Sequence, residues 1–411
     1  MRTLFITANN LPHARVSGGQ AATLSALELY AGLGPVHLVA LVEGTEPPGD
    51  LGLLRSLCQQ VVLVPTRLLF ARHRLHHLAL AARAAAQRTS FKLLKFRTPA
   101  FVQALCDAAR GGVWDVIHFD GLVTAQFGPL LPPGRRVLLE HNVEWEIFDR
   151  HAAHQRLLPA RWFGALEARR LRQAEIRLCS SVDLVLTLSD RDGDILARAG
   201  CQTPIRTLRL PVAVVAPPRP FEQTTPTVVS LGNLTNVGRE QGTLWFARAV
   251  WPRLRRRVPW ARWRIVGGNP TPAVRALHGR DGVEVLGFVP DLDVVLHDVR
   301  ACVVPLHIGG GIRVKLLDMF ARGVPCISTS IGAQGLEVAS GRELLLADEP
   351  AAFAEAVAQV LQDAETYTRL ALAGQHYLAA RHQWAACEAA FTHALAAAGV
   401  RGVGDGRAAN E

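Results

Sequence analysis

Short apolar runs alternate with longer helical segments along almost the whole chain, and this alternation is what most constrains the fold. The runs are rich in β-branched residues or leucine and end at Gly, Pro or Asp, whereas the segments between them are rich in Ala, Leu and Arg. Strands that alternate with helices build parallel sheets covered by helices. The sequence therefore predicts an α/β protein.

The predicted strands fall into two groups. The first group comprises residues 3–8, 36–42, 61–64, 115–119, 136–140 and 183–188. The second group comprises residues 227–231, 263–266, 283–286, 301–304, 324–328 and 343–346. The clearest helices between them are expected over residues 20–31 and 161–178.

A proline-rich segment separates the two groups, with five prolines within residues 211–226. A chain of 411 residues also exceeds what one hydrophobic core usually organises. Proline fixes extended backbone and disfavours helix, which suits a linker. The predicted parts are a first domain over 1–212, a linker over 213–226, a second domain over 227–375, a helix over 376–398 that packs back on the first domain, and a frayed tail over 399–411.

The net charge of +10 predicts an anionic partner: phosphorylated ligands, an acidic membrane surface or nucleic acid. Residues 51–106 contain no Asp or Glu but nine Arg or Lys, and from Arg67 to Arg97 basic residues alternate with Leu and Phe. Such a stretch fits an anionic inner-membrane surface or, equally, a solvated helix face that also covers the core. No nucleic-acid partner is expected, because no zinc finger, helix-turn-helix or aromatic stacking platform accompanies the charge.

The amino terminus is too briefly apolar for a signal peptide, and no stretch of about 18 uncharged apolar residues follows it. The seven cysteines form no C-x-x-C pair, which indicates buried thiols and not a zinc site or a disulfide framework. We therefore expect a cytoplasmic protein that associates at most peripherally with a membrane.

The most informative segment is residues 303–325, where a strand ends at Pro305 and three glycines, Gly309, Gly310 and Gly311, precede a helix that begins near Ile312. Backbone N–H groups at a helix start bind anions such as phosphate, and glycines permit close approach of the backbone. The alternative is a purely structural turn.

Three side chains follow these glycines on the predicted helix. Arg313 and Lys315 add two cations beside the anion site, and Asp318 supplies an acceptor for hydroxyl groups. A diphosphate followed by a ribose matches this order of groups.

The segment resembles the donor-binding motif of the retaining nucleotide-sugar glycosyltransferases called group 1 or family 4. Residues 265–267, ending at Gly267, resemble the family's "IVG" strand end, and residues 287–291 resemble its "G-x-V-x-D" loop, in which Val289 stands where the backbone contacts the base. Residues 328–336 resemble its "ST-x-x-G-x-x-GL" turn. The resemblance implies the GT-B fold: two Rossmann-like domains with parallel sheets facing across a cleft, the first on the acceptor side and the second binding the donor.

The first half of the chain carries two further resemblances. Gly18 and Gly19 lie between the first strand and the first helix, where family members have a Gly-Gly loop beside the donor phosphates. Residues 140–144 resemble an "HN-x-E" segment, with His141 at the position of a histidine that lines the active site. A histidine that is only structural is the alternative.

The chain also departs from the family pattern. Where many members carry two glutamates with seven residues between them, it has Gly310 and Asp318. His307 stands where related triple-glycine sequences have Arg, and the spacing near Arg239 makes that residue a third candidate phosphate contact. These departures do not affect the predicted fold or donor class, but they leave the identity of the transferred sugar open.

The resemblance implies transfer of a hexosyl group from a nucleoside-diphosphate sugar to an acceptor hydroxyl, with retention, in bacterial glycan, glycolipid or glycoconjugate synthesis. Arg313 and Lys315 would stabilise the leaving diphosphate, while His141 would contact the sugar or the acceptor. No cofactor beyond the nucleotide sugar and no metal is expected, because Asp291 and Asp293, which have Asp-x-Asp spacing, fit a base-binding loop better.

Two other functions stay open on the same fold. A nucleotide-sugar 2-epimerase would bring carboxylates and a histidine to the sugar ring. A catalytically silent nucleotide-sugar-binding homologue would fit the missing glutamate at Gly310. The donor sugar, the base and the acceptor are left open.

Overall fold

The computed structural model describes residues 1–8, 11, 18–44, 51–66, 74–110, 112–153, 157–234 and 237–400. Some sequence expectations lie outside these residues: those on residues 67–73 and on the tail beyond residue 400. The chain forms two compact units. Unit 1 comprises Met1–Leu210 and Ala385–Glu411, and unit 2 comprises Pro211–Trp384.

Among the described residues of unit 1, a sheet of seven parallel strands has the order β3-β2-β1-β4-β5-β6-β7. The strands are β1 (Thr3–Ala8), β2 (Val36–Glu43), β3 (Gln60–Thr66), β4 (Val116–Asp120), β5 (Arg135–Glu140), β6 (Leu184–Thr187) and β7 (Ile205–Thr207). The first strand therefore lies between β2 and β4, and the order of strands reverses at this point.

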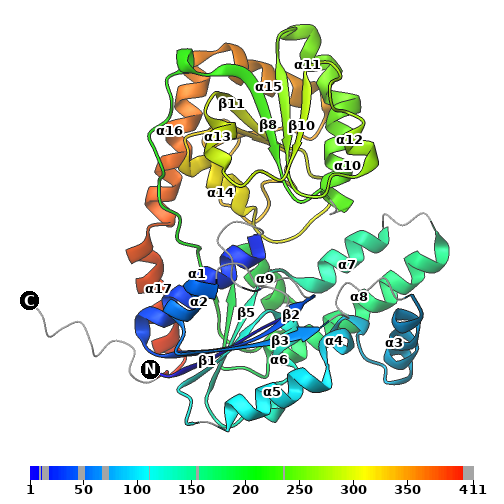
Figure 1. Ribbon diagram of the computed structural model, residues 1–411, viewed down its shortest axis with the longest axis vertical. Helices are drawn as coiled ribbons and strands as arrows, with labels where there is room; N and C mark the ends of the chain where they lie inside the picture. Colours follow the sequence, from blue (N-terminus) through cyan, green and yellow to red (C-terminus); the bar gives the residue numbers. More distant parts are fainter. Residues whose placement is uncertain are drawn as a thin grey trace, which may run out of the picture. The chain divides into compact units, whose positions relative to one another are not determined.

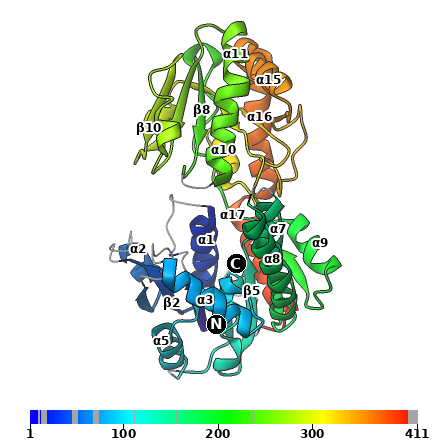
Figure 2. The same ribbon diagram turned by 90° about the vertical axis from the view of Figure 1, so that its right-hand side faces the viewer.

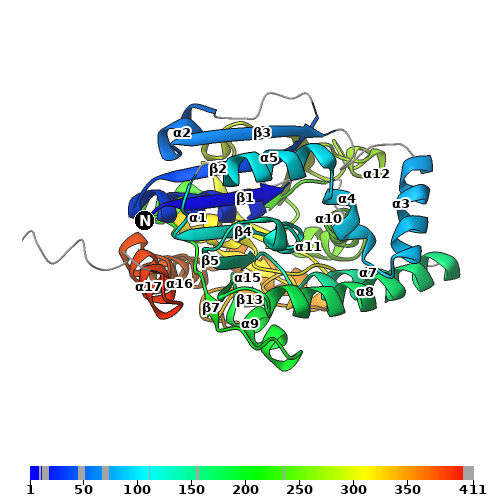
Figure 3. The same ribbon diagram turned by 90° about the horizontal axis from the view of Figure 1, so that it is seen from below.

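The helices of unit 1 pack on both faces of its sheet (Figure 1). They are α1 (Gly18–Leu33), α2 (Leu51–Leu57), α3 (Arg74–Ala86), α4 (Phe91–Phe96), α5 (Pro99–Ala109), α6 (Leu122–Ala125), η1 (Gly128–Leu130), α7 (Glu144–Ala153), α8 (Leu158–Cys179), α9 (Asp190–Arg198) and α17 (Trp384–Ala397). Leu4 and Ile6 join one buried core with Phe101 of α5, whereas the alternate residue Phe5 contacts Tyr30 of α1. Figure 3 shows the strands of this sheet from below.

The described part of unit 2 contains a sheet of six parallel strands with the order β10-β9-β8-β11-β12-β13. The strands are β8 (Thr225–Leu231), β9 (Arg262–Val266), β10 (Val283–Gly287), β11 (Val299–Val304), β12 (Cys326–Ser328) and β13 (Leu345–Leu346). The order again reverses beside the first strand, here between β8 and β11.

Helices cover both faces of the second sheet as well (Figure 2). They are η2 (Phe221–Gln223), α10 (Val237–Trp245), the π-helical turn η3 (Phe246–Val250), α11 (Trp251–Arg257), α12 (Pro272–Arg275), α13 (Leu292–Leu296), α14 (Val314–Ala321), α15 (Pro350–Gln362) and α16 (Ala364–Arg381). Val228 faces a core with Phe353 of α15, and Val229 faces a second core with Phe320 of α14. This three-layer arrangement confirms the predicted α/β class.

The observed elements differ from the expected ones in two places that matter for the site. Strand β7 was not predicted, because it has only three residues and carries Arg206 at its centre. Helix α14 begins at Val314, so Ile312 and Arg313 belong to the loop before it. In the described part of the chain, no helix combines the length and the apolar character needed to cross a membrane.

Candidate active site

The glycine-rich segment of unit 2 follows β11, the strand beside the point where the strand order reverses. In open parallel sheets, ligands bind outside the carboxyl ends of the strands at such a switch point. The loop after β8 reaches the same edge, because β8 and β11 are neighbours in the sheet. Residues from both loops are therefore candidates for one ligand site within unit 2.

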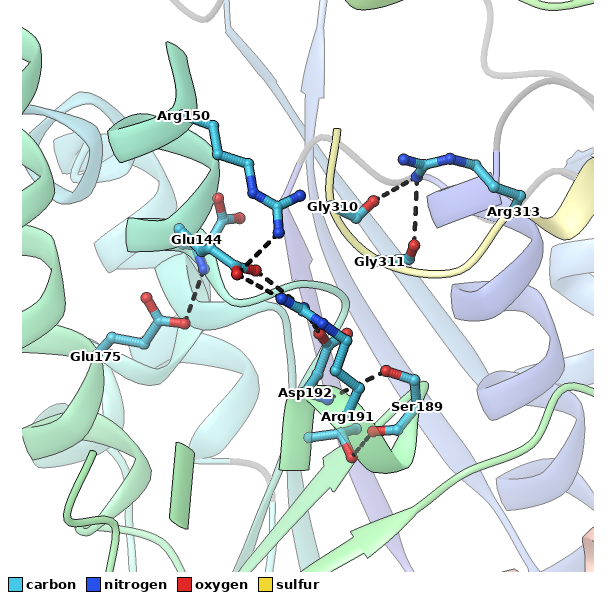
Figure 4. Close-up of polar contacts among 11 residues, drawn as sticks. Glu144, Arg150, Glu175, Ser189, Arg191, Asp192, Gly310, Gly311 and Arg313 are labelled. Carbon is cyan, nitrogen blue, oxygen red and sulfur yellow. Dashed lines mark hydrogen bonds and ion pairs between the residues drawn. The ribbon is translucent and has the colours of Figure 1, made fainter. Parts of the chain in front are cut away.

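The Arg313 side chain holds the glycine loop by donating hydrogen bonds to the loop's backbone carbonyl groups. Its Nη1 donates to the Gly310 carbonyl oxygen at 2.5 Å and to that of Gly311 at 3.3 Å (Figure 4). Gly311 has a φ of 66°, in the left-handed region that glycine adopts without strain. The guanidinium thus fixes the loop's shape immediately before the first N–H groups of α14.

Lys315 and Arg239 form a second cationic feature of this edge. The Arg239 side chain runs along Gly232 at the end of β8, where a Cβ would lie 2.8 Å from its Cδ. Burial and the nearby charge of Arg239 lower the pKa of Lys315 to about 7. Two cations held together in this way favour the arrival of an anion.

Gly267 allows the ends of β8 and β9 to approach closely. A Cβ built on Gly267 would lie 1.5 Å from the carbonyl oxygen of Gly232, whose own N–H donates to the Val266 carbonyl oxygen at 2.9 Å. Only glycine fits there. The glycine of the expected "IVG" strand end is thus required for packing, independently of any role in donor binding.

The turn after β12 is bonded to the loop after β11. The Thr329 hydroxyl donates to the Leu306 carbonyl oxygen and accepts from the Gly332 N–H at 3.0 Å. At the far end of the turn, a Cβ on Gly335 would lie 3.0 Å from Cγ2 of Ile312. The two loops therefore support each other.

Asp318 lies one helical turn before Arg322 and forms an ion pair with it. Arg322 Nε also donates to Asp293 at 2.6 Å, in the segment that carries Val289. This shared arginine links Asp318 to the loop expected to contact the base. The sequence reasoning did not identify Arg322.

His307 packs edge-on against Trp245 of α10, with ring centroids 4.5 Å apart. Burial lowers the pKa of His307, so it is neutral near pH 7. Its buried Nε2 has no hydrogen-bond partner among the described residues. A neutral His307 therefore offers one ring nitrogen as a hydrogen-bonding group, whereas the arginine of related sequences would offer a positive charge.

The switch point of unit 1 gathers a separate polar cluster around Asp120, the last residue of β4. Its Oδ2 accepts from the hydroxyls of Thr7 in β1 at 2.6 Å and Thr23 in α1 at 2.8 Å. The Thr23 hydroxyl also contacts the carbonyl oxygen of Gly19, the second residue of α1. Gly19 is therefore tied to the carboxyl ends of β1 and β4.

His141 completes this cluster. Its Nε2 lies 2.7 Å from Asp120 Oδ1, and both side chains are buried. The Asp120 carboxylate raises the pKa of His141 despite its burial, and His141 in turn holds the pKa of Asp120 below its usual value. The buried Nδ1 of His141 has no hydrogen-bond partner in the described part of the chain.

The start of α7, directly after His141, is held by buried carboxylates. Glu175 of α8 accepts from the Glu144 N–H at 2.9 Å, and burial raises the pKa of Glu175. Lys92 forms an ion pair with Glu144. Figure 4 labels Glu144 and Glu175.

A further ion-pair network joins α7 to α9. Arg191 Nη1 donates to Glu146 at 3.0 Å and Arg150 pairs with the same carboxylate at 2.8 Å (Figure 4). Ser189 caps α9 by accepting from the Asp192 N–H at 3.2 Å. We assign these groups a structural part.

The comparison with known families decides the class of unit 2. Residues 225–363, from β8 to the end of α15, match the family described as glycosyl transferases group 1. This part of the chain is therefore similar to the group 1 glycosyltransferases. The resemblance inferred from the glycine-rich segment is confirmed.

Solved structures confirm that the chain has the GT-B fold. Sucrose-phosphate synthase from Thermosynechococcus elongatus matches with a TM-score of 0.69 at 17% identity, covering 95% of this chain and 97% of that one. HepE of Anabaena in complex with UDP-glucose matches with a TM-score of 0.67 at 14% identity, covering 97% and 100%. A TarM variant of S. aureus, in complex with Fondaparinux, α-GlcNAc-glycerol and UDP, matches with a TM-score of 0.65 at 8% identity, covering 96% and 99%.

No curated protein matches the chain in sequence. Among its described residues, the chain has no group of three or more His, Cys, Asp or Glu arranged to hold a metal ion.

The sequence missed Asp120, although a signal was present. An acid at the carboxyl end of a predicted buried strand is exceptional, because a buried carboxylate requires bonded partners. The predicted strand ended at Phe119, one residue short of Asp120, so the acid was assigned to the following loop.

Proposed function

We propose that the chain is a retaining glycosyltransferase that moves a hexosyl group from a nucleoside-diphosphate sugar to an acceptor hydroxyl in glycan, glycolipid or glycoconjugate synthesis. The observation that carries this proposal is the pair of cations, Lys315 and Arg239, beside the glycine loop at the switch point of unit 2. Burial of like charges destabilises the empty site, and a diphosphate would relieve that repulsion.

Cleavage of the donor leaves a diphosphate whose negative charge grows in the transition state. Preorganised N–H groups and fixed cations stabilise such charge most in a water-excluded site. Lys315 and Arg239 are assigned to the phosphate oxygens. Gly309, Gly310, Gly311 and Ile312 present the backbone, and Arg313 keeps that backbone in shape.

The remaining donor contacts follow the order of groups in a nucleoside diphosphate. Asp318 accepts the ribose hydroxyls, with Arg322 fixing its carboxylate, and the backbone near Val289 meets the base. Gly267 shapes the strand end next to the phosphates.

In unit 1, His141 contacts the sugar or the acceptor through Nδ1, and Asp120 positions its ring. Gly18 and Gly19 offer N–H groups at the start of α1. The bond from the anomeric carbon to the diphosphate breaks while the bond to the acceptor oxygen forms on the same face, and the acceptor proton passes to the leaving phosphate. No further base is needed.

UDP-sugars are the first donors to test, because HepE and TarM were solved with UDP or UDP-glucose. The test is a thermal-shift and calorimetry screen of nucleoside diphosphates and their sugar conjugates, followed by assay of nucleoside diphosphate release. We expect binding of a diphosphate, lost in the Arg239→Met, Lys315→Met double variant. Equal affinity of the double variant for every nucleotide would overturn the assignment. Detection of an epimerised nucleotide sugar in a reaction that contains no acceptor would instead identify the protein as an epimerase.

A further inference from the structure

The amino-terminal end of α8 exposes a cluster of large apolar side chains. We call this cluster the α8 patch; its members are Leu157, Leu158, Trp162, Phe163 and Leu166. Trp162 is 78% exposed and Leu157 is 71% exposed, values that exclude a place in the core. Contiguous apolar surface on a soluble protein marks a site of interaction.

The periodicity of α8 puts most of the α8 patch on one side of the helix. Leu158, Trp162 and Leu166 recur every four residues and so form one stripe. Further along, Glu167 and Leu171 are buried. The stripe thus occupies the part of α8 that does not pack into unit 1.

This end of α8 packs against α7. A Cβ on Gly164 would lie 2.8 Å from the Cβ of Ala152, so α7 and α8 touch closely there. Figures 1 and 3 show the amino-terminal end of α8 extending past the strands of unit 1. The patch therefore stands out from the surface as a two-helix projection.

The exposed charged side chains of α8 itself are positive. Arg161, Arg169 and Arg172 of α8 are exposed, whereas the two carboxylates of this helix, Glu167 and Glu175, are buried. Glu167 accepts hydrogen bonds from Ser90 at 2.5 Å and from two backbone N–H groups of α4, and Glu175 accepts from the start of α7. Neither carboxylate offsets the surface charge.

The basic stretch noted in the sequence adjoins this surface. Phe163 packs edge-on against Phe91 of α4, with ring centroids 6.4 Å apart. Through this contact and the Glu167 bonds, α8 holds α4 in place. Arg88, which precedes α4, and Arg97, which follows it, are both exposed and add to the positive charge.

We propose that the α8 patch docks unit 1 onto an anionic lipid bilayer. Trp162, Leu158 and Leu166 enter the boundary between headgroups and acyl chains, and the neighbouring arginines contact lipid phosphates. Apolar residues beside arginines, with no exposed acid on the helix, are the pattern of an interfacial helix. This attachment is independent of the transfer reaction proposed for unit 2.

The test is co-sedimentation of the full chain with vesicles of phosphatidylcholine, alone or with phosphatidylglycerol. We expect binding to the anionic vesicles, weakened by salt, and little binding to the neutral ones. The double variant L158Q/W162Q should bind the anionic vesicles about tenfold or more weakly, because two apolar side chains no longer enter the bilayer. The variant R161E/R169E should lose a similar factor.

Matched controls lie in unit 2. Trp260 is 63% exposed and follows the basic last turn of α11, but no other exposed large apolar side chain is close to it in the sequence. W260Q and R256E should therefore leave vesicle binding unchanged. Circular dichroism and thermal melting check that all variants fold.

Two outcomes would overturn the proposal. One is equal binding of anionic vesicles by the wild type and L158Q/W162Q. The other is a concentration-dependent dimer in gel filtration that L158Q/W162Q abolishes while vesicle binding persists, which would assign the patch to a second copy of the chain.

Discussion

The imidazole Nε2 of His141 lies 2.7 Å from Oδ1 of Asp120, and both side chains are buried at the point where the strand order of unit 1 reverses. Asp120 is held in turn by Thr7 and Thr23. The carboxylate has no freedom to turn, so it fixes the orientation of the imidazole ring. The same bond makes the histidine readily protonated.

Asp120→Asn should destabilise the protein and slow transfer. Loss of the carboxylate leaves a buried imidazole without its counter-charge, which costs about 3 kcal/mol of unfolding free energy. Because the pKa of Asp120 is lowered and that of His141 is raised, the loss should be complete between about pH 4 and pH 6.5 and shrink as the pH rises through the raised histidine pKa. Urea unfolding at pH 5.5 and pH 9 measures it.

The control for this variant is Asp107→Asn, at an exposed i,i+3 pair with Arg110. It should change stability by no more than about 0.5 kcal/mol. A pH-independent loss in Asp120→Asn would show that the carboxylate acts by packing alone.

Lys315→Met should stabilise the ligand-free protein and abolish diphosphate binding. The pKa of Lys315 falls from 10.5 in the unfolded chain to about 7 in the folded state. Between pH 7 and pH 10.5 the unfolded chain therefore binds a proton that the folded protein has lost. The resulting penalty is complete below pH 7 and fades as the pH rises toward 10.5. Thermal melts at pH 7 should show a higher Tm for the variant than for the wild type, with a smaller difference at pH 10. Arg256→Met, on an exposed residue of α11, is the control and should leave the Tm unchanged.

Diphosphate binding should take up protons above pH 7. The ligand's charge raises the pKa of Lys315, so a neutral lysine gains a proton when the complex forms. Calorimetry of UDP binding at pH 8 in buffers of different ionisation enthalpy measures this uptake, and affinity should fall as the pH increases. A binding heat that does not depend on the buffer would exclude Lys315 from the phosphate site.

Gly267→Ala should cost about 3 kcal/mol or more, because its Cβ would collide with the Gly232 carbonyl oxygen and force β8 and β9 apart. The neighbouring Gly268→Ala is the matched control: a Cβ there meets nothing within 4 Å, so stability should stay within about 0.5 kcal/mol of the wild type. Equal melting temperatures of the two variants would contradict the close approach of the strand ends.

Thr329→Val should raise the donor KM and lower stability by about 2 kcal/mol, since the Leu306 carbonyl and the Gly332 N–H lose their shared partner. Thr329→Ser keeps the hydroxyl and should recover most of both. If the valine variant binds UDP like the wild type, the two loops do not depend on each other.

Local patterns were enough to predict most of the fold. The strand expected at residues 3–8 coincides with β1, and the helix expected over residues 161–178 lies within α8. Alternation of apolar runs and helical segments is a local property of the sequence, so it can be recognised without knowing which strands pair. The short edge strand β7 depends on its pairing with β6 and gave no such signal.

The site was predicted only where its residues lie close together in sequence. Residues 309–318 could be interpreted as one motif, but the meeting of Arg239 with Lys315 depends on the adjacency of β8 and β11. The bonds from Asp120 to Thr7 and His141 join β1, β4 and the residue that follows β5. Contacts of this kind are set by sheet order, which periodicity does not reveal.

The last described helix, α17, packs against the first: the Phe391 and Tyr30 rings meet edge to face 4.9 Å apart. Unit 2, in contrast, is built from one continuous stretch of chain. During synthesis, the middle of the polypeptide can therefore complete its packing before the beginning does, since the opening α-helix must wait for its partner to emerge from the ribosome. Truncating the chain before residue 391 would leave Tyr30 and its neighbours uncovered and expose apolar surface that chaperones bind. The sheet of unit 2 would still fold.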